Sequence, residues 1–184
     1  MRHNKTIMRS KNILSVVAFI AAFGLSVAFA SLFISKNTYS CSSTNYLKYK
    51  QNPATAEAIT DLIHEDYVNG YNRSEKIYDI GESYPPDVNS VAFADYAEAI
   101  EGYVDDSSSM DANDLPGDFQ TAWRGHMEAW RDYSTFLNQS ADISGRTACS
   151  LRKFNATESL HNQKINRTWF EVLQIGRSYG ANVR

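Results

Sequence analysis

The feature that most constrains the fold is a periodic run of aromatic residues between Leu115 and Leu137. At about 100° per residue, an α-helix places six side chains of this run on one narrow stripe. They are Phe119, Trp123, His126, Trp130, Tyr133 and Leu137. Pro116 and Asp118 are typical of a first helical turn, because proline needs no N–H partner there and a carboxylate faces the positive end of the helix. The run therefore predicts an amphipathic helix that buries an aromatic seam.

Segments before this helix have the same periodicity. The first begins at Pro53 and is expected to end near Asn69-Gly70, since glycine readily adopts the left-handed conformation that closes many helices. Residues 74–82 form a weaker segment, which is either a short helix or an extension of the first one. Residues 89–106 present one apolar and one acidic face, and they predict another helix.

The chain after the aromatic helix is predicted as a loop over residues 138–156 and a last helix over residues 157–179, ending at Gly180. This last helix carries Trp169 on its inward face, so we expect Trp123, Trp130 and Trp169 to meet in the core. Four amphipathic helices without an alternating strand pattern bury their apolar faces best against one another. The predicted fold is all-α, an antiparallel four-helix-type bundle over residues 53–184.

A long apolar segment precedes this bundle. Residues 13–35 contain no charge and would span roughly 34 Å as a helix, enough to cross a hydrocarbon core of about 30 Å. Residues 1–12 are basic and therefore favour the cytoplasmic side. The sequence predicts a single-pass signal anchor at residues 13–35, a connector at residues 36–52 and a bundle outside the cytoplasmic (inner) membrane. The alternative is secretion after cleavage following Ala30, because Ala28-Phe29-Ala30 has the form that signal peptidases accept.

Charge is distributed unevenly along the chain. Residues 36–184 contain 21 acidic and 14 basic residues, a formal charge of −7, which does not suit binding to nucleic acid. Residues 53–118 are strongly acidic, with 16 acidic and two basic residues, whereas residues 119–184 have five acidic and nine basic ones. Two interpretations stay open: an acidic face that attracts a cationic partner or divalent ions, or acidic and basic helices that lie side by side.

The two cysteines, Cys41 and Cys149, both fall on the predicted outer side of the membrane. Two cysteines in an oxidising compartment favour one disulfide, here between the connector and the chain before the last helix. Free thiols and an intermolecular bridge are the alternatives. No CxxC or CxxH spacing occurs, so the cysteines do not predict a metal site.

The residue with the most suggestive position is His126, which lies one helical turn from both Trp123 and Trp130. In a helical bundle, such a histidine can bind haem or a metal ion. It can equally be a buried neutral imidazole that makes hydrogen bonds within the core. We therefore regard Trp123, His126 and Trp130 as candidate ligand-binding residues, with both interpretations of the histidine open.

A second candidate site is the pair Glu158 and His161, three residues apart on the inward face of the last helix. Glu-x-x-His pairs build the di-iron sites of some helical bundles. The glutamates of the other helices, however, fall on polar faces, so the partners that such a site needs are missing. Glu158 and His161 are candidate metal ligands, and no cofactor is expected.

Motifs of known catalytic sites are absent from the chain, including GxSxG, HExxH, the P-loop and GxGxxG. The sequence predicts a non-enzymatic, membrane-anchored accessory, assembly or ligand-sensing module, with a membrane or envelope protein as its partner. The alternative is a redox protein that binds a metal or haem through a histidine in the bundle core. An enzyme whose site is assembled from separate helices also stays open, because such a site leaves no short motif.

Overall fold

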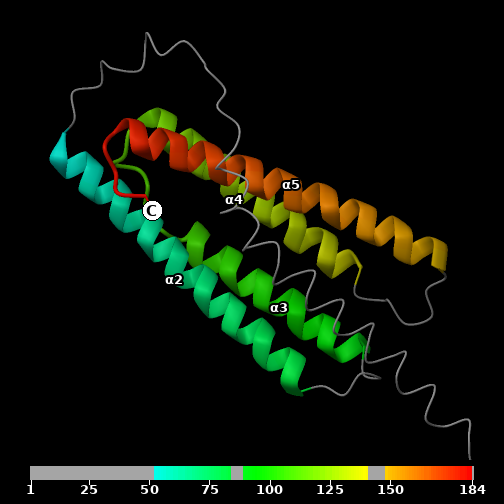
Figure 1. The fold of residues 1–184 in the computed structure, drawn as a ribbon. Coiled ribbons are helices and arrows are strands. Elements are labelled where there is room, and N and C mark those ends of the chain that lie inside the picture. Colours follow the sequence, from blue (N-terminus) through cyan, green and yellow to red (C-terminus); the bar gives the residue numbers. More distant parts are fainter. Residues whose placement is uncertain (1–51, 84–88, 141–147, 184) are drawn as a thin grey trace, which may run out of the picture.

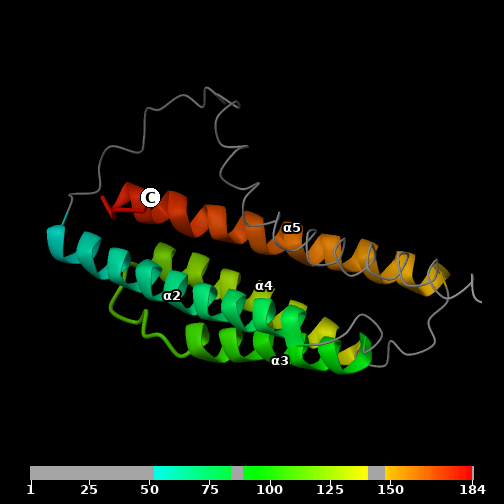
Figure 2. The ribbon, with the colours of Figure 1, turned by 60° about the horizontal axis from the view of Figure 1, so that its bottom comes forward.

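The structure is a computed structural model that describes residues 52–83, 89–140 and 148–183. These residues form four helices and no strand: α2 (Pro53–Ser83), α3 (Asn89–Ser108), α4 (Gly117–Gln139) and α5 (Ala148–Ser178). Consecutive helices run in opposite directions, with α3 beside α2 and α5 beside α4 (Figure 1 and Figure 2). The prediction of an all-α fold is confirmed for these residues, and the helices pack as a bundle.

The predicted anchor, residues 13–35, lies outside the described residues, as do residues 1–12, Cys41 and nearly all of the connector. Among the helices that the structure describes, none combines the length and the apolar character needed to cross a bilayer. Cys149 is exposed near the start of α5, and the described ranges contain no disulfide. The disulfide between Cys41 and Cys149 therefore stays a prediction.

The predicted end of the first helix at Asn69-Gly70 is wrong, because α2 continues through both residues. In the described part of the chain, Gly180 is the one residue with a positive φ, so Gly70 does not adopt the closing conformation. Asn69 Nδ2 instead donates a hydrogen bond to Ser107 Oγ of α3, at 3.2 Å. Beyond the glycine, Ile77 packs against the core. Contacts with α3 thus favour a continuous helix over the local end signal.

The last helix also starts earlier than predicted, so residues 148–156 are helical and not loop. Phe154 anchors this added segment, with its ring centroid 5.9 Å from that of Phe93 and 5.0 Å from that of Phe136. The predicted end is confirmed. Gly180 has a φ of 87°, and Ala181 N–H donates to the Gly176 carbonyl at 3.1 Å.

The core consists of two apolar clusters along the bundle. One cluster lies near the start of α2 and the end of α5, and its largest members are Ile59, Leu62, Ile63, Leu115, Phe119, Trp123, Met127, Val172 and Leu173. The other includes Phe93, Tyr96, Ile100, Tyr133, Leu137, Phe154 and Ile165. Trp130 is half-buried and packs against both clusters. Its indole therefore bridges the two halves of the core.

The four helices differ in how closely they pack and in their charge. Contact is most extensive between α4 and α5, and it is much less extensive between α2 and α5. The acidic helices α2 and α3 consequently pair with each other, as do the more basic α4 and α5. Within the described ranges, one ion pair forms, between Lys164 Nζ and Asp132 Oδ2 at 2.6 Å. The helices therefore pair mainly with a neighbour of similar charge, and the acidic α3 meets the less acidic α4 at a smaller interface. The acidic face that would attract a cationic partner stays a prediction.

Two glycine substitutions are expected to change stability in opposite directions. A Cβ added at Gly176 would lie 3.3 Å from methyl carbons of both Ile59 and Ile63 on α2, so Gly176→Ala should lower the free energy of unfolding by about 1–2 kcal/mol. A Cβ at Gly125 on α4 would meet no atom within 4 Å, so Gly125→Ala should raise it by about 0.5–1 kcal/mol. Urea denaturation followed by circular dichroism measures both. If both variants changed the free energy of unfolding equally, this result would contradict the close approach of α5 to α2.

Candidate functional site

The candidate residues Trp123, His126 and Trp130 lie on successive turns of α4, in the middle of the bundle. His126 is only 2% exposed. Its ring centroid lies 6.2 Å from that of Trp123, 6.4 Å from that of Trp130 and 5.0 Å from that of Trp169 on α5. The three indole rings therefore surround the imidazole. In the described ranges no two of these indoles form a ring contact with each other, so the tryptophans come together only through His126.

Both ring nitrogens of His126 have hydrogen-bond partners. The indole N–H of Trp130 donates to His126 Nε2 at 3.2 Å, which requires Nε2 to be unprotonated. The proton consequently resides on Nδ1, which lies 3.0 Å from Thr168 Oγ1 on α5. Thr168 Oγ1 in turn donates to the Ile165 carbonyl at 2.9 Å. A continuous chain of hydrogen bonds thus crosses from α4 to α5.

Burial has a strong effect on the charge of this histidine. Loss of hydration lowers the pKa of His126 to about 3, and the positive charge of Arg73 acts in the same direction. The imidazole is therefore neutral near pH 7. A metal ion or haem iron would have to displace either the Trp130 N–H or Thr168 to reach a ring nitrogen.

Two ionisable side chains of α2, Asp66 and Arg73, lie close to His126 and its partners and form with them a polar layer in the core. The guanidinium carbon of Arg73 lies 4.7 Å from the ring centroid of Tyr103 and 4.6 Å from that of Trp130, a cation–π arrangement. The Tyr103 hydroxyl donates to Asp66 Oδ1 at 2.8 Å. Burial raises the pKa of Asp66, while hydrogen bonds from Ser107 and Tyr103 oppose the rise.

Asp66 and Arg73 were not among the predicted site residues, although their spacing in the sequence indicates a buried position. Both follow Ile59 at intervals of seven residues, which places them on the helix side that Ile59 buries. A carboxylate and a guanidinium at such positions need partners inside the protein. Tyr103 and Trp130 supply them from α3 and α4.

The second candidate pair, Glu158 and His161, lies next to a separate chain of hydroxyl groups. The hydroxyl oxygens of Tyr96 and Tyr133 are 2.8 Å apart, and Tyr133 donates to Glu158 Oε1 at 3.1 Å. His161 stacks on Phe136, with ring centroids 5.0 Å apart. Burial raises the pKa of Glu158 and lowers that of His161, so it disfavours the charged form of each.

Metal binding by this pair would need a further ligand. In the part of the chain that the structure describes, no three side chains of the types His, Cys, Asp or Glu come close enough to hold a metal ion. Glu158 and His161 are thus near each other on α5 but belong to no larger set of such ligands. Their metal role stays a prediction.

The chain was compared with protein-family models, with curated proteins and with solved structures, and none of them matches. The residues of the bundle and their geometry are therefore the basis for a functional assignment.

Proposed function

We propose that this chain is a membrane-tethered module that acts by binding a partner protein at the outer face of the cytoplasmic membrane, as an accessory, assembly or ligand-sensing component. The tether is the uncharged segment at residues 13–35, and the basic residues 1–12 favour the orientation with the bundle outside. The observation that carries the proposal is the state of His126. His126 is the side chain best suited to acid–base catalysis. Both of its ring nitrogens make hydrogen bonds within the core, however, and its ring is inaccessible to a substrate.

General acid–base catalysis needs a group within hydrogen-bond reach of the substrate and a pKa near the working pH. His126 is buried, and its pKa of about 3 makes it a weak base. Asp66 is buried and accepts a hydrogen bond from Tyr103, and Glu158 accepts a hydrogen bond from Tyr133. These polar groups hold helices together, which supports binding over catalysis.

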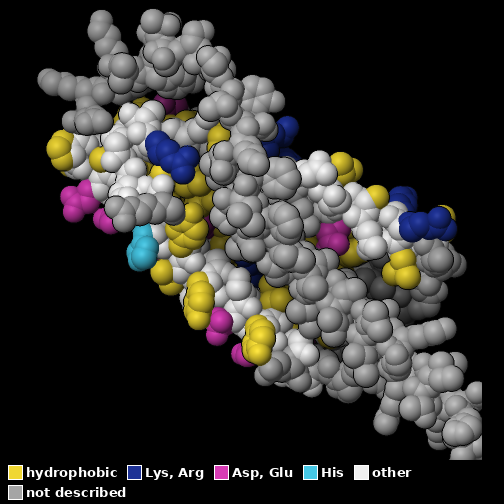
Figure 3. Space-filling view, viewed as in Figure 1, with side chains coloured by type: hydrophobic (Ala, Val, Ile, Leu, Met, Phe, Trp, Pro, Cys, Tyr) yellow, Lys and Arg dark blue, Asp and Glu magenta, His cyan; other side chains and the backbone are white. Residues whose placement is uncertain are grey.

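The surface most suited to a protein partner is a row of exposed tyrosines on α2. Tyr67, Tyr71 and Tyr78, here called the tyrosine face, are spaced so that they project from one side of the helix. Tyr71 is the most exposed of them, at 64%. Hydrophobic side chains, with acidic ones among them, are spaced along α2 in the space-filling view (Figure 3). Exposed tyrosine is enriched in protein–protein interfaces, because it combines a large apolar ring with a hydroxyl group.

The alternative function, redox chemistry at a metal or haem, stays a prediction from the sequence. It requires His126 to give up a hydrogen bond, or Glu158 and His161 to find further ligands. The geometry therefore favours the binding module.

A test of the proposal is affinity capture of the full-length chain from membranes in mild detergent. The chain should be released from the membrane fraction only by detergent, and a partner should be recovered with it. Tyr71→Ser should reduce that recovery by about tenfold or more if Tyr71 is central to the interface. Leu160→Ser is a matched control, since Leu160 on α5 is also 64% exposed.

Three outcomes of this experiment would contradict the proposal. Recovery of the chain alone at every concentration would exclude a stable partner. Equal loss with both variants would show that exposed apolar area, and not the tyrosine face, retains the partner. Release without detergent would contradict the tether.

A further inference from the structure

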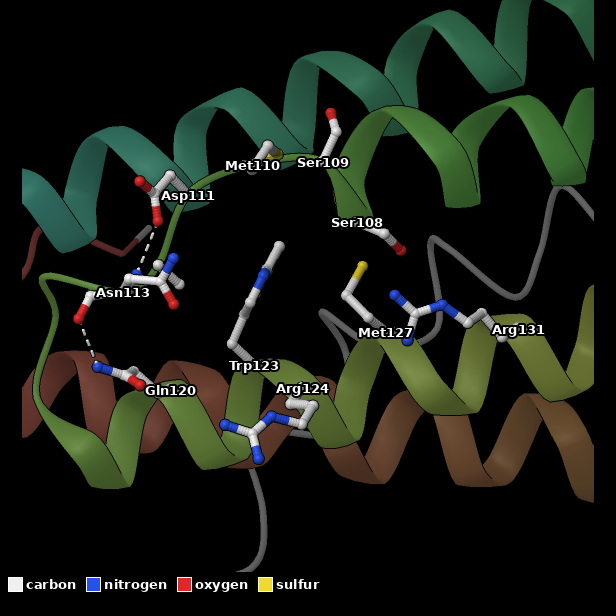
Figure 4. A pocket seen from close by; sticks show the side chains of 11 residues that line it. Ser108, Ser109, Met110, Asp111, Asn113, Gln120, Trp123, Arg124, Met127 and Arg131 are labelled. Atoms are coloured by element: carbon white, nitrogen blue, oxygen red, sulfur yellow. Dashed lines mark hydrogen bonds between the residues drawn. The ribbon is translucent and has the colours of Figure 1, made fainter.

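A cavity of about 440 Å³ lies between α4 and the segment that joins α3 to α4. Its volume is within the range typical of sites for small molecules, roughly 300–1,000 Å³. It is lined by Ser108, Ser109, Met110, Asp111, Ala112, Asn113, Gln120, Trp123, Arg124, Met127 and Arg131. Figure 4 shows Trp123 projecting from α4 into the space below the joining segment. His126 and Trp130 are not among the lining residues, so this cavity is separate from the buried polar layer.

One wall of the cavity presents two cations. Arg124 and Arg131 are both exposed on α4, and within the described ranges neither makes an ion pair or a hydrogen bond. They are seven residues apart, so their backbones are separated by roughly 10 Å along the helix axis. Two flexible guanidinium groups at this spacing can approach one small molecule from both ends. Each offers a pair of N–H donors that fits a carboxylate.

A third donor in the cavity also lacks a partner. The hydroxyl oxygen of Ser108, at the end of α3, is buried and makes no hydrogen bond with the described residues. A buried polar group without a partner costs free energy, so such groups are rare in folded proteins. A ligand oxygen in the cavity would satisfy the Ser108 hydroxyl.

The segment that joins α3 to α4 forms the opposite wall of the cavity, and hydrogen bonds hold this segment in place. Gln120 Nε2 donates to the carbonyls of Asn113 and Leu115, both at 2.7 Å. Asp111 Oδ1 accepts the backbone N–H of Asn113 at 2.9 Å. Asp111 is the one carboxylate among the lining residues, and this bond directs it to its own segment. A ligand carboxylate is consequently favoured on the arginine side of the cavity.

Part of the cavity lining is apolar. Trp123 and Met127 come from the same helix as Arg124 and Arg131, and both are almost fully buried. They therefore offer almost no surface to a ligand, and the accessible apolar part of the lining comes mainly from Met110 and Ala112 of the joining segment, which are partly buried. Inorganic phosphate would leave this apolar surface uncovered, whereas methylene groups would bury it.

We propose that this cavity binds a short organic dicarboxylate. Arg124 and Arg131 each hold one carboxylate, Met110 and Ala112 contact the carbon chain, and Ser108 donates to a carboxylate oxygen. The inference depends on this cavity alone and is independent of the tyrosine face of α2 and of the tether.

Titration calorimetry of the folded full-length protein in detergent with sodium succinate tests the proposal. We expect saturable binding with a Kd between about 0.1 and 1 mM, which weakens at high salt because both arginines are exposed. Arg124→Gln and Arg131→Gln should each weaken binding about tenfold or more, and Ser108→Ala should weaken it several-fold. Arg167→Gln is the matched control, because Arg167 is an exposed arginine on α5 that does not line the cavity.

Other ligands test whether the site prefers an organic dicarboxylate, and the variants test whether the two arginines bind it. Acetate should bind more weakly than succinate, since it reaches one arginine only. Inorganic phosphate binding as tightly as succinate would overturn the assignment of an organic dicarboxylate. Absence of saturable binding up to about 10 mM succinate would overturn the site itself. So would equal affinity in Arg124→Gln, Arg131→Gln and the Arg167→Gln control, with circular dichroism showing that each variant is folded.

Discussion

Trp130→Ala should lower the free energy of unfolding by about 3–5 kcal/mol, the loss typical of a large aromatic residue removed from a core. The indole is half-buried but packs against both apolar clusters, so its removal disrupts the contact between the two halves of the bundle. Its loss also leaves His126 Nε2 buried without a donor and takes one aromatic ring away from Arg73. Chemical denaturation of the full-length protein, followed by far-ultraviolet circular dichroism, measures this loss.

Two further variants separate the contributions of Trp130. Trp130→Phe keeps a ring but removes the N–H donor, so its expected cost is about 1–3 kcal/mol. Phe170→Ala removes an exposed aromatic residue of α5 and should change stability by no more than about 0.5 kcal/mol. A loss below about 1 kcal/mol for Trp130→Ala would show that the indole does not support the core.

Acidification from pH 7 to pH 4 should destabilise the fold through His126. In the unfolded chain, this imidazole has a pKa near 6.5, whereas burial lowers its pKa to about 3 in the folded protein. Between these two values, the unfolded state binds a proton that the folded state does not. The stability due to His126 is therefore fully present above pH 6.5 and falls by up to about 1.4 kcal/mol for each pH unit below it.

The carboxyl groups of Asp66, which is buried, and of Glu158, which is half-buried, act in the opposite direction. Burial raises the pKa of Asp66 and that of Glu158, so the folded state takes up their protons more readily than the unfolded state as the pH falls. Their contribution rises on acidification and offsets part of the loss at His126. The difference between two proteins isolates the histidine. His126→Gln keeps a donor and an acceptor but does not titrate in this range.

Thermal unfolding of the wild type and of His126→Gln at pH 7, 6, 5 and 4 measures this difference. We expect His126→Gln to be less stable than the wild type at pH 7, and the gap to shrink as the pH falls. Parallel stability profiles for the two proteins would contradict a buried neutral imidazole.

A helix boundary can be predicted from the sequence where the periodicity of apolar residues within that helix determines it. Boundaries that depend on contacts with other helices cannot be predicted in this way. The stripe from Phe119 to Leu137 repeats on every turn, and α4 matches the prediction closely. The prediction at Gly70 fails because the packing of α2 on α3 outweighs a local end signal. The start of α5 was missed because Phe154 is a lone aromatic residue in a polar stretch, and its partners Phe93 and Phe136 come from other helices.

The same distinction applies to the candidate sites: positions along one helix could be predicted, whereas contacts between helices could not. The position of His126 among tryptophans follows from the spacing along α4, but the roles of Thr168 and Arg73 depend on how α5 and α2 pack against it. The spacing of Arg124 and Arg131 indicates only that they lie away from the aromatic stripe of α4, so neither was among the predicted site residues. The cavity that they line exists because the segment after α3 folds back over α4, which no periodicity in the sequence describes.

The hydrogen bonds from His126 to Thr168 and from Tyr133 to Glu158 join α4 to α5 at two separate heights along the bundle. Sliding one helix past the other by a single turn, about 5.4 Å, would break both and leave their buried groups without partners. Axial slippage is therefore blocked even where the apolar surfaces alone would tolerate it. A pull or push on one of these two helices would move them together as a rigid pair.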